Sequence, residues 1–291
     1  MFRHLFLCFV FVLTILPGHA QLKRFTFSQP KMGSPFTIIF YSTDSVQANI
    51  TAEQCFQLVD SLVIIYSDYL DSSELNKLCA TAGKTHNYAQ VSPALFDILL
   101  LSKIAYEKSN GTFEITLGPL TKLWRKARKE KIFPDNATVK EKLALTGFNK
   151  IKIDSATQRV LLLQPGMQLD LGGIAQGYIG QRVIDFLKEK NIDDALVDVS
   201  GDIVTIGAPP NTNGWTVGIN VPGKTAELQK QALLISNKAV TTSGDAYQYM
   251  EHNGKRYSHI IDPKTGYGIT SQKNVTVIAN DGTTADWLTK A

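Results

Sequence analysis

The sequence predicts an α+β fold, in which a mixed, largely antiparallel sheet is packed with helices. Helical patterns fall mainly before residue 190 of the 291-residue chain, whereas short strand patterns crowd the segment after residue 194. This order lacks the regular strand–helix alternation that builds a doubly wound parallel sheet. The dipeptide Asn253-Gly254 between two strand patterns indicates a tight hairpin turn, which joins antiparallel strands.

Three segments carry the apolar spacing of amphipathic helices. The first is expected over 51–66, with Thr51 as its cap. The second begins after Ser92, a capping residue, with Pro93 at its first position, and Asn110-Gly111 ends it. The third is expected from about residue 174 to 190.

Strands are expected in short apolar or alternating runs bounded by turn residues. The first lies within residues 31–43, and the others lie at 195–199, 215–221, 232–236, 256–261 and 274–280.

Residues 1–20 have the organisation of a secretory signal peptide. Arg3 precedes an uncharged apolar run from Leu5 to Leu16, and Ala20 suits cleavage. A membrane anchor is the competing interpretation, but such a run is shorter than the roughly 20 residues that a spanning helix needs. We therefore expect an exported protein of the periplasm or cell envelope, with residues 21–291 forming one domain or two subdomains.

The net charge and the cysteine count indicate which partners and which disulfides to expect. The net charge of +4 is too small to indicate nucleic-acid or membrane binding, so we expect no nucleic acid and membrane association only through partners. Beyond the leader the chain has only Cys55 and Cys79. They are either packed as small apolar residues or joined in one disulfide, and they form no disulfide framework.

The run "DLGGIAQGY" at 170–178 is a candidate phosphate-binding turn. Asp170 ends an apolar run, Gly172 and Gly173 let the backbone approach a ligand, and a helix follows. The first turn of a helix offers unpaired N–H groups and partial positive charge to an anion. A tight structural turn is the alternative, because the spacing matches neither the Walker loop nor the dinucleotide fingerprint.

Two further polar segments carry less information. "TTSGD" at 241–245 suits either a polar ligand or an ordinary turn. The lysine-rich segment 122–142 is expected to be a solvated helix face rather than a phosphate-binding patch.

His259 is the histidine best placed for chemistry. It lies in an apolar strand pattern and precedes Asp262 by three residues. Asp262 would orient the imidazole as a general base. A histidine satisfied within the core is the alternative interpretation.

No cluster of histidines and cysteines has zinc-site spacing. A magnesium ion needs fewer protein ligands when substrate phosphates complete its shell. Asp286 and Thr289 would share one face of a C-terminal helix, although a charge that complements a helix dipole explains Asp286 equally well.

Eight motifs occur together in a characteristic order. They are "KMGSPF", "SDYLDSSELNKL", "GTFEITLGPLTKLW", "DLGGIAQGY", "VDVSGDIVTIG", "AVTTSGD", "RYSHIIDPKTG" and "TTADWL". In this order the chain resembles the FAD:protein FMN transferase family, the ApbE-type flavin transferases, whose fold is related to the T-fold. The resemblance implies a Mg²⁺-dependent exported enzyme that attaches FMN from FAD to a threonine or serine of an exported acceptor protein and releases AMP.

The resemblance also implies roles for individual residues. His259 would activate the acceptor hydroxyl, and Asp286, Thr289 and the backbone carbonyl of Ala175 would bind the metal ion. The residues implied in binding the dinucleotide or lying near it are Met32, Tyr69, Glu114, Thr116, Gly118, Asp170, Gly173, Thr242, Ser243, Gly244 and His259.

The sequence departs from the family pattern at several positions. Gln176 replaces a lysine, Ser200-Gly201 replaces a double glycine, and Lys290 stands where the metal-binding threonine is expected. The family pattern continues beyond Ala291, so the resemblance implies a domain incomplete at its C-terminal end. Two alternative functions stay open: an FAD pyrophosphatase that yields FMN and AMP, and a non-catalytic FAD-binding protein.

Overall fold

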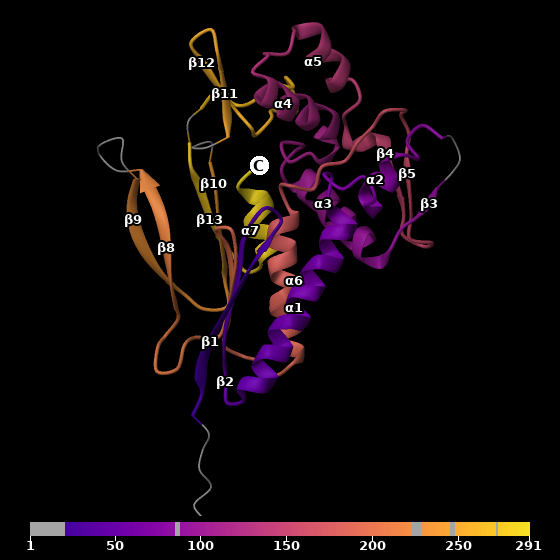
Figure 1. Cartoon of the computed structure of the whole chain (residues 1–291). Coiled ribbons are helices and arrows are strands. Elements are labelled where there is room, and N and C mark those ends of the chain that lie inside the picture. Colours follow the sequence, from indigo (N-terminus) through magenta and orange to yellow (C-terminus); the bar gives the residue numbers. More distant parts are fainter. Residues whose placement is uncertain (1–20, 85–87, 223–227, 245–247, 272) are drawn as a thin grey trace, which may run out of the picture.

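The computed structural model describes residues 21–84, 88–222, 228–244, 248–271 and 273–291. The expected leader, residues 1–20, lies outside the described residues. A six-stranded sheet with the order β1-β2-β6-β7-β10-β13 forms the centre of the molecule (Figure 1). Every neighbouring pair in this sheet is antiparallel, and helices pack against it, so the predicted fold class is confirmed.

The large sheet is built from strands far apart in the sequence. Its members are β1 (Lys23–Lys31), β2 (Ser34–Ser42), β6 (Ala195–Val199), β7 (Asp202–Ile206), β10 (Ala239–Ser243) and β13 (Val275–Ala279). Strand β1 was not expected from the sequence, although Phe25 and Phe27 alternate with polar residues in the strand pattern.

Three helices cover one face of this sheet. They are α1 (Ser45–Tyr66), α6 (Ala175–Glu189) and α7 (Gly282–Leu288). Helix α1 packs on β1 and β2, α6 on β6 and β7, and α7 on β10 and β13. The other face is covered by the hairpin of β8 (Trp215–Pro222) and β9 (Leu228–Ile235), as Figure 1 shows.

Strand β6 shows how alternation fills both faces. Ala195, Val197 and Val199 belong to the core cluster under the helices, whereas Leu196 packs with Trp215 of the hairpin. Because successive side chains of a strand point to opposite faces, both faces of this strand carry apolar residues, and Asp198 is its one polar residue.

A second group of elements adjoins the helical layer. Its helices are α2 (Glu74–Cys79), α3 (Pro93–Lys108), α4 (Gly118–Glu130) and α5 (Asn136–Leu143), with the short turns η1 (Ile115–Leu117) and η2 (Phe148–Lys150). Its sheet has the order β3-β5-β4, from β3 (Ala89–Gln90), β4 (Ile151–Asp154) and β5 (Arg159–Leu162). The hairpin of β11 (Tyr249–His252) and β12 (Lys255–Ser258) lies near α4 (Figure 1).

Local sequence signals set most element ends. Ser92 caps α3, and Asn253-Gly254 has the positive φ angles, 49° and 72°, of the predicted hairpin turn. Helix α1 differs, because it begins at Ser45 and its cap is Asp44, which accepts from two backbone N–H groups. Thr51 is buried inside the helix, so its predicted capping role was wrong.

Cys55 and Cys79 are free and buried, so the packing interpretation is confirmed and the disulfide is not formed. Burial raises the pKa of the Cys55 thiol to about 12, which leaves it unreactive.

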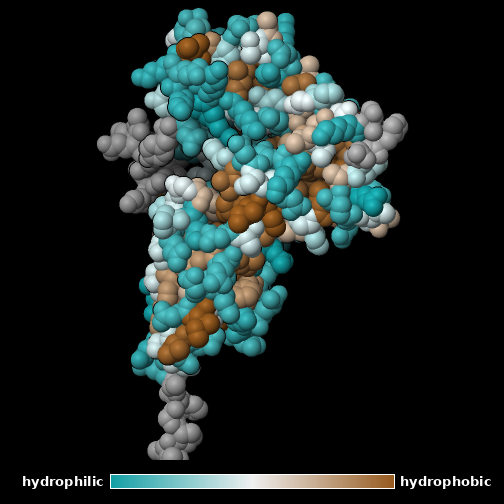
Figure 2. All heavy atoms as spheres, turned by 45° about the vertical axis from the view of Figure 1, so that its right-hand side comes forward, coloured by the Kyte–Doolittle hydropathy of each residue, from teal (hydrophilic) through white to brown (hydrophobic). Residues whose placement is uncertain are grey.

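Figure 2 shows hydrophobic residues on one face in separate groups among hydrophilic ones. Scattered exposed apolar side chains of this kind are usual on globular proteins. Among the described residues, no helix combines the length and apolarity needed to cross a bilayer.

Candidate active site

A cleft of about 770 Å³ lies where the helical layer, α4 and the segment after β12 meet. Its walls come from the β1–β2 turn, the segment after α1, the turn before α6, residues 259–261 and Lys290. The volume lies in the range of about 300–1,000 Å³ that is usual for small-molecule sites. Met32 reaches this cleft from a two-residue turn in which it has a φ of 53° and Gly33 a φ of 79°.

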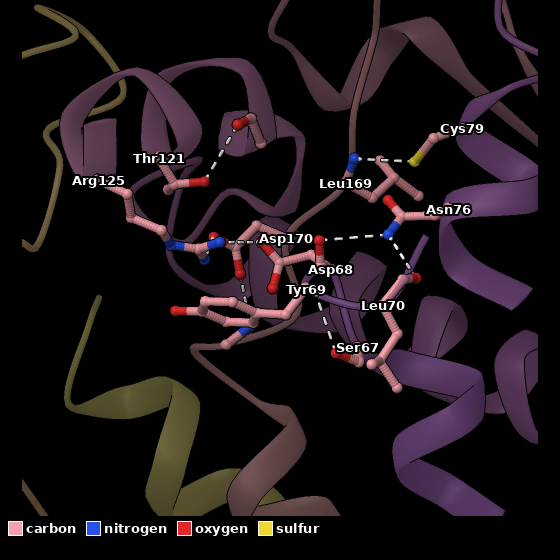
Figure 3. A network of polar contacts seen from close by, with 12 residues as sticks. Ser67, Asp68, Tyr69, Leu70, Asn76, Cys79, Thr121, Arg125, Leu169 and Asp170 are labelled. Atoms are coloured by element: carbon pink, nitrogen blue, oxygen red, sulfur yellow. Dashed lines mark hydrogen bonds and ion pairs between the residues drawn. The ribbon is translucent and has the colours of Figure 1, made fainter. Parts of the chain in front are cut away.

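Arg125 holds two carboxylates together in the wall of the cleft (Figure 3). Its Nη1 donates to Asp68 Oδ2 at 2.5 Å, and its Nη2 donates to Asp170 Oδ2 at 3.2 Å. The guanidinium lies 4.1 Å from the ring centroid of Tyr69, which is 74% exposed. The planar fork of arginine suits this double contact, which a lysine could not reproduce.

The two carboxylates are fixed by their own turns. Asp170 Oδ1 accepts from Gly172 N at 2.8 Å, directly before α6. Asp68 lies just after the end of α1, where burial and the neighbouring Asp170 raise the pKa of its carboxyl. Arg125 opposes that rise in pKa by hydrogen bonding and charge, so the three groups form one electrostatic unit.

The turn before α6 brings backbone close to the cleft. Gly172 and Gly173 both line it, and a Cβ on Gly173 would lie 3.2 Å from Phe113 Cε2. Ala175 also lines the cleft at the first position of α6. The predicted phosphate-binding turn therefore lies in the cleft wall, and its role in binding phosphate stays a prediction.

Asp286 is fully buried beneath this turn rather than in the cleft. Its Oδ2 accepts from Gly177 N at 2.9 Å, so the carboxylate satisfies a first-turn N–H of α6. Its Oδ1 forms an ion pair with Lys290 Nζ, and Lys290 lines the cleft. Thr289 is 6% exposed and its hydroxyl donates to the Asp286 carbonyl at 2.7 Å, inside its own helix.

A second acid, Asp202, is buried beside Asp286. Burial, and then the charge of Asp286, raise the pKa of Asp202 to about 7. Lys290 and a hydrogen bond from Thr241 act in the opposite direction. Two acids and one ammonium therefore share the space under the start of α6.

The segment 111–118 forms another wall, mainly through internal hydrogen bonds. Glu114 lines the cleft, but its carboxylate accepts from Thr116 N and Phe148 N, each at 2.8 Å. Thr116 is fully buried and its hydroxyl accepts from Gly147 N. A Cβ on Gly118 would lie 2.6 Å from the backbone oxygen of Gln168. Thr116 and Gly118 thus shape the wall and do not line the cleft.

His259 lies just after β12 and lines the cleft. Its Nδ1 lies 3.2 Å from the carbonyl oxygen of Gln248. Asp262 differs from its expected role, because its carboxylate accepts from Lys264 N at 2.9 Å and Thr265 Oγ1 at 3.0 Å. Asp262 therefore stabilises the turn that follows and does not line the cleft.

Thr242, Ser243 and Gly244 lie at the end of β10 and outside the lining described for the cleft. The Thr242 hydroxyl lies 2.9 Å from the hydroxyl of Thr276 on β13. The last residue of the "TTSGD" run, Asp245, lies outside the described residues.

The cleft unites many of the expected residues and adds others. The expected residues that line it are Met32, Tyr69, Glu114, Asp170, Gly173, Ala175 and His259. Asp68, Arg125, Arg128 and Lys290 were not expected among them. Arg125 and Arg128 belong to the segment interpreted as a solvated face, and their three-residue spacing was the available signal.

Residues 32–291 match the family model described as the ApbE family. The chain belongs to the ApbE family. This match covers the turn at Met32, the cleft and the C-terminal helix, so the predicted family is confirmed.

Two curated relatives and a solved structure give the extent of the similarity. An FAD:protein FMN transferase of Klebsiella pneumoniae (strain 342) is 34% identical over 269 residues, which are 92% of this chain and 81% of the relative. One of Treponema pallidum (strain Nichols) is 32% identical, over 94% of this chain and 79% of the relative. The crystal structure of the apo form of Pseudomonas stutzeri flavinyl transferase ApbE superposes with a TM-score of 0.81 at 27% identity, covering 93% of this chain and 84% of that one.

The residues present do not fit the magnesium ion that the resemblance implies. Both oxygens of Asp286 are engaged, one by a backbone N–H and one by an ammonium group. The Thr289 hydroxyl is turned into its own helix, and the part of the chain that the structure describes has no group of three or more His, Cys, Asp or Glu residues placed to hold a metal. A divalent cation prefers such anionic oxygens unshared with another cation.

Proposed function

We propose that this chain is an FAD:protein FMN transferase, which moves FMN from FAD to a threonine or serine hydroxyl of an acceptor protein and releases AMP. The curated relatives that carry this name match more than nine tenths of the chain. The side chains around Asp286 do not fit a magnesium ion, so the proposed reaction includes none.

One observation carries the proposal: His259 lies in the same cleft as the phosphate-binding turn. Arg125, Arg128 and Lys290 give this cleft cationic groups, and Gly172 and Gly173 give it backbone that a pyrophosphate can approach. A transferase needs this combination, because the base must reach the acceptor hydroxyl at the point where that hydroxyl attacks the phosphorus atom.

The proposed reaction joins the acceptor hydroxyl to FMN and breaks the pyrophosphate of FAD. His259 accepts the proton of the acceptor hydroxyl, and the hydroxyl oxygen forms a bond to the phosphorus on the FMN side of FAD. The bond from that phosphorus to the bridging oxygen breaks, and AMP leaves with the bridging oxygen. The products are a phosphoester on the acceptor and free AMP, so no oxidant or reductant is consumed.

The test is FMN transfer to an acceptor protein, measured by the mass of the acceptor and by AMP release. His259→Ala should lower the rate of transfer about 10²–10⁴-fold, the usual contribution of a general base, while FAD affinity changes little. His252→Ala is the matched control, because His252 stacks on Phe133 at 4.0 Å and does not line the cleft. Transfer at the wild-type rate by His259→Ala would refute the role of His259.

The same assay separates the alternatives. FMN and AMP released without a modified acceptor would identify a pyrophosphatase. Bound FAD that stays intact would identify a non-catalytic FAD-binding protein. Only a mass increase on the acceptor, matched by AMP, supports the transferase.

We also propose that the protein acts outside the cytoplasm on an exported acceptor. The support is the signal-peptide pattern of residues 1–20, which ends at Ala20. N-terminal sequencing of protein recovered from the cell envelope should find Gln21 as the first residue, and an intact Met1 would refute export by cleavage.

A further inference from the structure

Lys290 lies between a buried acid and the cleft. Asp286 has no exposed side-chain surface, whereas the side chain of Lys290 is 20% exposed and lines the cleft. Lys290 Nζ pairs with Asp286 Oδ1 and also lies 3.3 Å from the Asp286 carbonyl oxygen. One face of the ammonium is thus held by Asp286, and the group stands at the cleft wall.

The carboxylate of Asp286 requires a positive partner in this position. A buried carboxylate without compensation is strongly unfavourable. Oδ2 receives one backbone N–H, and Asp202, which is 6% exposed, adds a second acid nearby. Lys290 supplies a full positive charge at the remaining oxygen, Oδ1.

The stem of Lys290 follows the phosphate-binding turn. A Cβ on Gly173 would lie 3.7 Å from Lys290 Cγ, and both residues line the cleft together with Ala175 and Gln176. The aliphatic part of Lys290 therefore packs against this turn, and its ammonium lies on the Asp286 side of it.

A metal ion at the same place would have to displace the ammonium. Magnesium requires its own contact to a carboxylate oxygen in strict octahedral geometry, and Oδ1 is the oxygen that Lys290 occupies. Two cations on one oxygen repel each other, so Lys290 and a divalent ion are alternatives at Asp286.

We propose that the Lys290 ammonium takes the place of the divalent cation at Asp286, and that FAD binds to this chain through its phosphates without Mg²⁺. This inference rests on the proposed function, because it assigns a role within the same FAD site. Lys290 is then a binding residue that carries in the chain the charge that a metal ion would bring.

The first experiment measures FAD affinity by calorimetry on the full chain, in EDTA and in excess MgCl₂. Wild-type affinity should agree within about twofold between the two conditions. Lys290→Thr should bind FAD about tenfold or more weakly in EDTA, the effect of losing one charged hydrogen bond. Lys188→Thr is the matched control: Lys188 is exposed near the far end of α6, and its replacement should leave both affinities unchanged.

The second experiment uses Mn²⁺ as a probe that does not depend on activity. Electron paramagnetic resonance should detect no bound Mn²⁺ on the wild-type chain, with or without FAD. Stoichiometric Mn²⁺ binding to the wild-type chain that Asp286→Asn abolishes would overturn the inference, as would a wild-type FAD affinity that Mg²⁺ raises tenfold. Because neither of these outcomes depends on Lys290→Thr, they decide the question even if that variant does not fold. Absence of FAD binding in both conditions would instead refute the proposed function, and this inference with it.

Discussion

Gly177 lies where helices α6 and α7 touch, directly above the buried Asp286. Its replacement by alanine tests both the helix contact and the hydrogen bond to Asp286. It lies in the first turn of α6, where its N–H donates to the buried Asp286. A Cβ at this position would lie 2.1 Å from the carbonyl oxygen of Gly282 and 2.6 Å from Asp286 Cβ. Gly282 is equally close in return, since its own Cβ would lie 2.4 Å from the Gly177 oxygen. The start of α6 and the start of α7 therefore touch through backbone.

The cost of Gly177→Ala follows from three contributions. Forcing apart two packed backbones costs about 1–3 kcal/mol, as overpacking usually does. Weakening the hydrogen bond to the buried carboxylate adds about 1.5–3 kcal/mol at most. The better helix propensity of alanine returns about 1 kcal/mol. We expect the free energy of unfolding to fall by about 3 kcal/mol, which lowers the Tm by about 5 °C in a protein of this size.

Two other glycines calibrate the measurement. A Cβ on Gly180, also in α6, would meet only side chains, at 3.1 and 3.2 Å, so Gly180→Ala should cost less. Gly218 in β8 has nothing within 4 Å of the added Cβ, so Gly218→Ala should leave stability unchanged or slightly higher. Urea denaturation followed by circular dichroism gives the three values. If Gly177→Ala were no less stable than Gly180→Ala, the close contact of α6 and α7 would be refuted.

Two further predictions concern buried charges. Arg125→Ala leaves Asp68 and Asp170 facing each other, so the free energy of unfolding, measured in urea, should fall by about 3 kcal/mol. This is the lower end of the range for a broken buried pair, because Arg125 is 27% exposed. Arg125→Lys should recover part of the lost stability, and equal stability of wild type and Arg125→Ala would contradict this network. The pKa of Asp202 is raised from 3.8 to about 7, so the native state binds this proton more tightly, and stability falls as the pH rises from about 4 to about 7, by at most about 4 kcal/mol. Thermal unfolding across this pH range should show a smaller fall for Asp202→Asn than for wild type, and an equal fall would contradict the assignment.

Local signals predicted the elements whose ends depend on local chemistry. Ser92 and Pro93 start α3 because a hydroxyl cap and a fixed φ act within one turn. The start of α1 was placed six residues late, because the segment from Ser45 to Ile50 has little apolar periodicity and its cap, Asp44, lies before it. Strand β1 was missed although Phe25 and Phe27 alternate, because none of its residues is fully buried and its apolar signal is weak.

The residues missed in the cleft share a physical reason. Arg125 lies in a lysine-rich segment, where hydropathy cannot distinguish one half-buried guanidinium from its solvated neighbours. Its partners Asp68 and Asp170 come from turns 57 and 45 residues away in the sequence, so no local pattern connects the three.

Lys290 shows how a departure from a family pattern acquires meaning only in three dimensions. In the sequence, Lys290 replaces an expected metal-binding threonine, which weakens the case for a metal-dependent reaction of FAD. In the fold, the Lys290 ammonium pairs with the Asp286 carboxylate, because the four-residue spacing brings the two side chains together. Gln176, the neutral residue at the position of an expected lysine, lines the cleft together with Lys290. Under the proposal, the positive charge near the predicted phosphate-binding turn therefore comes from Lys290 rather than from position 176.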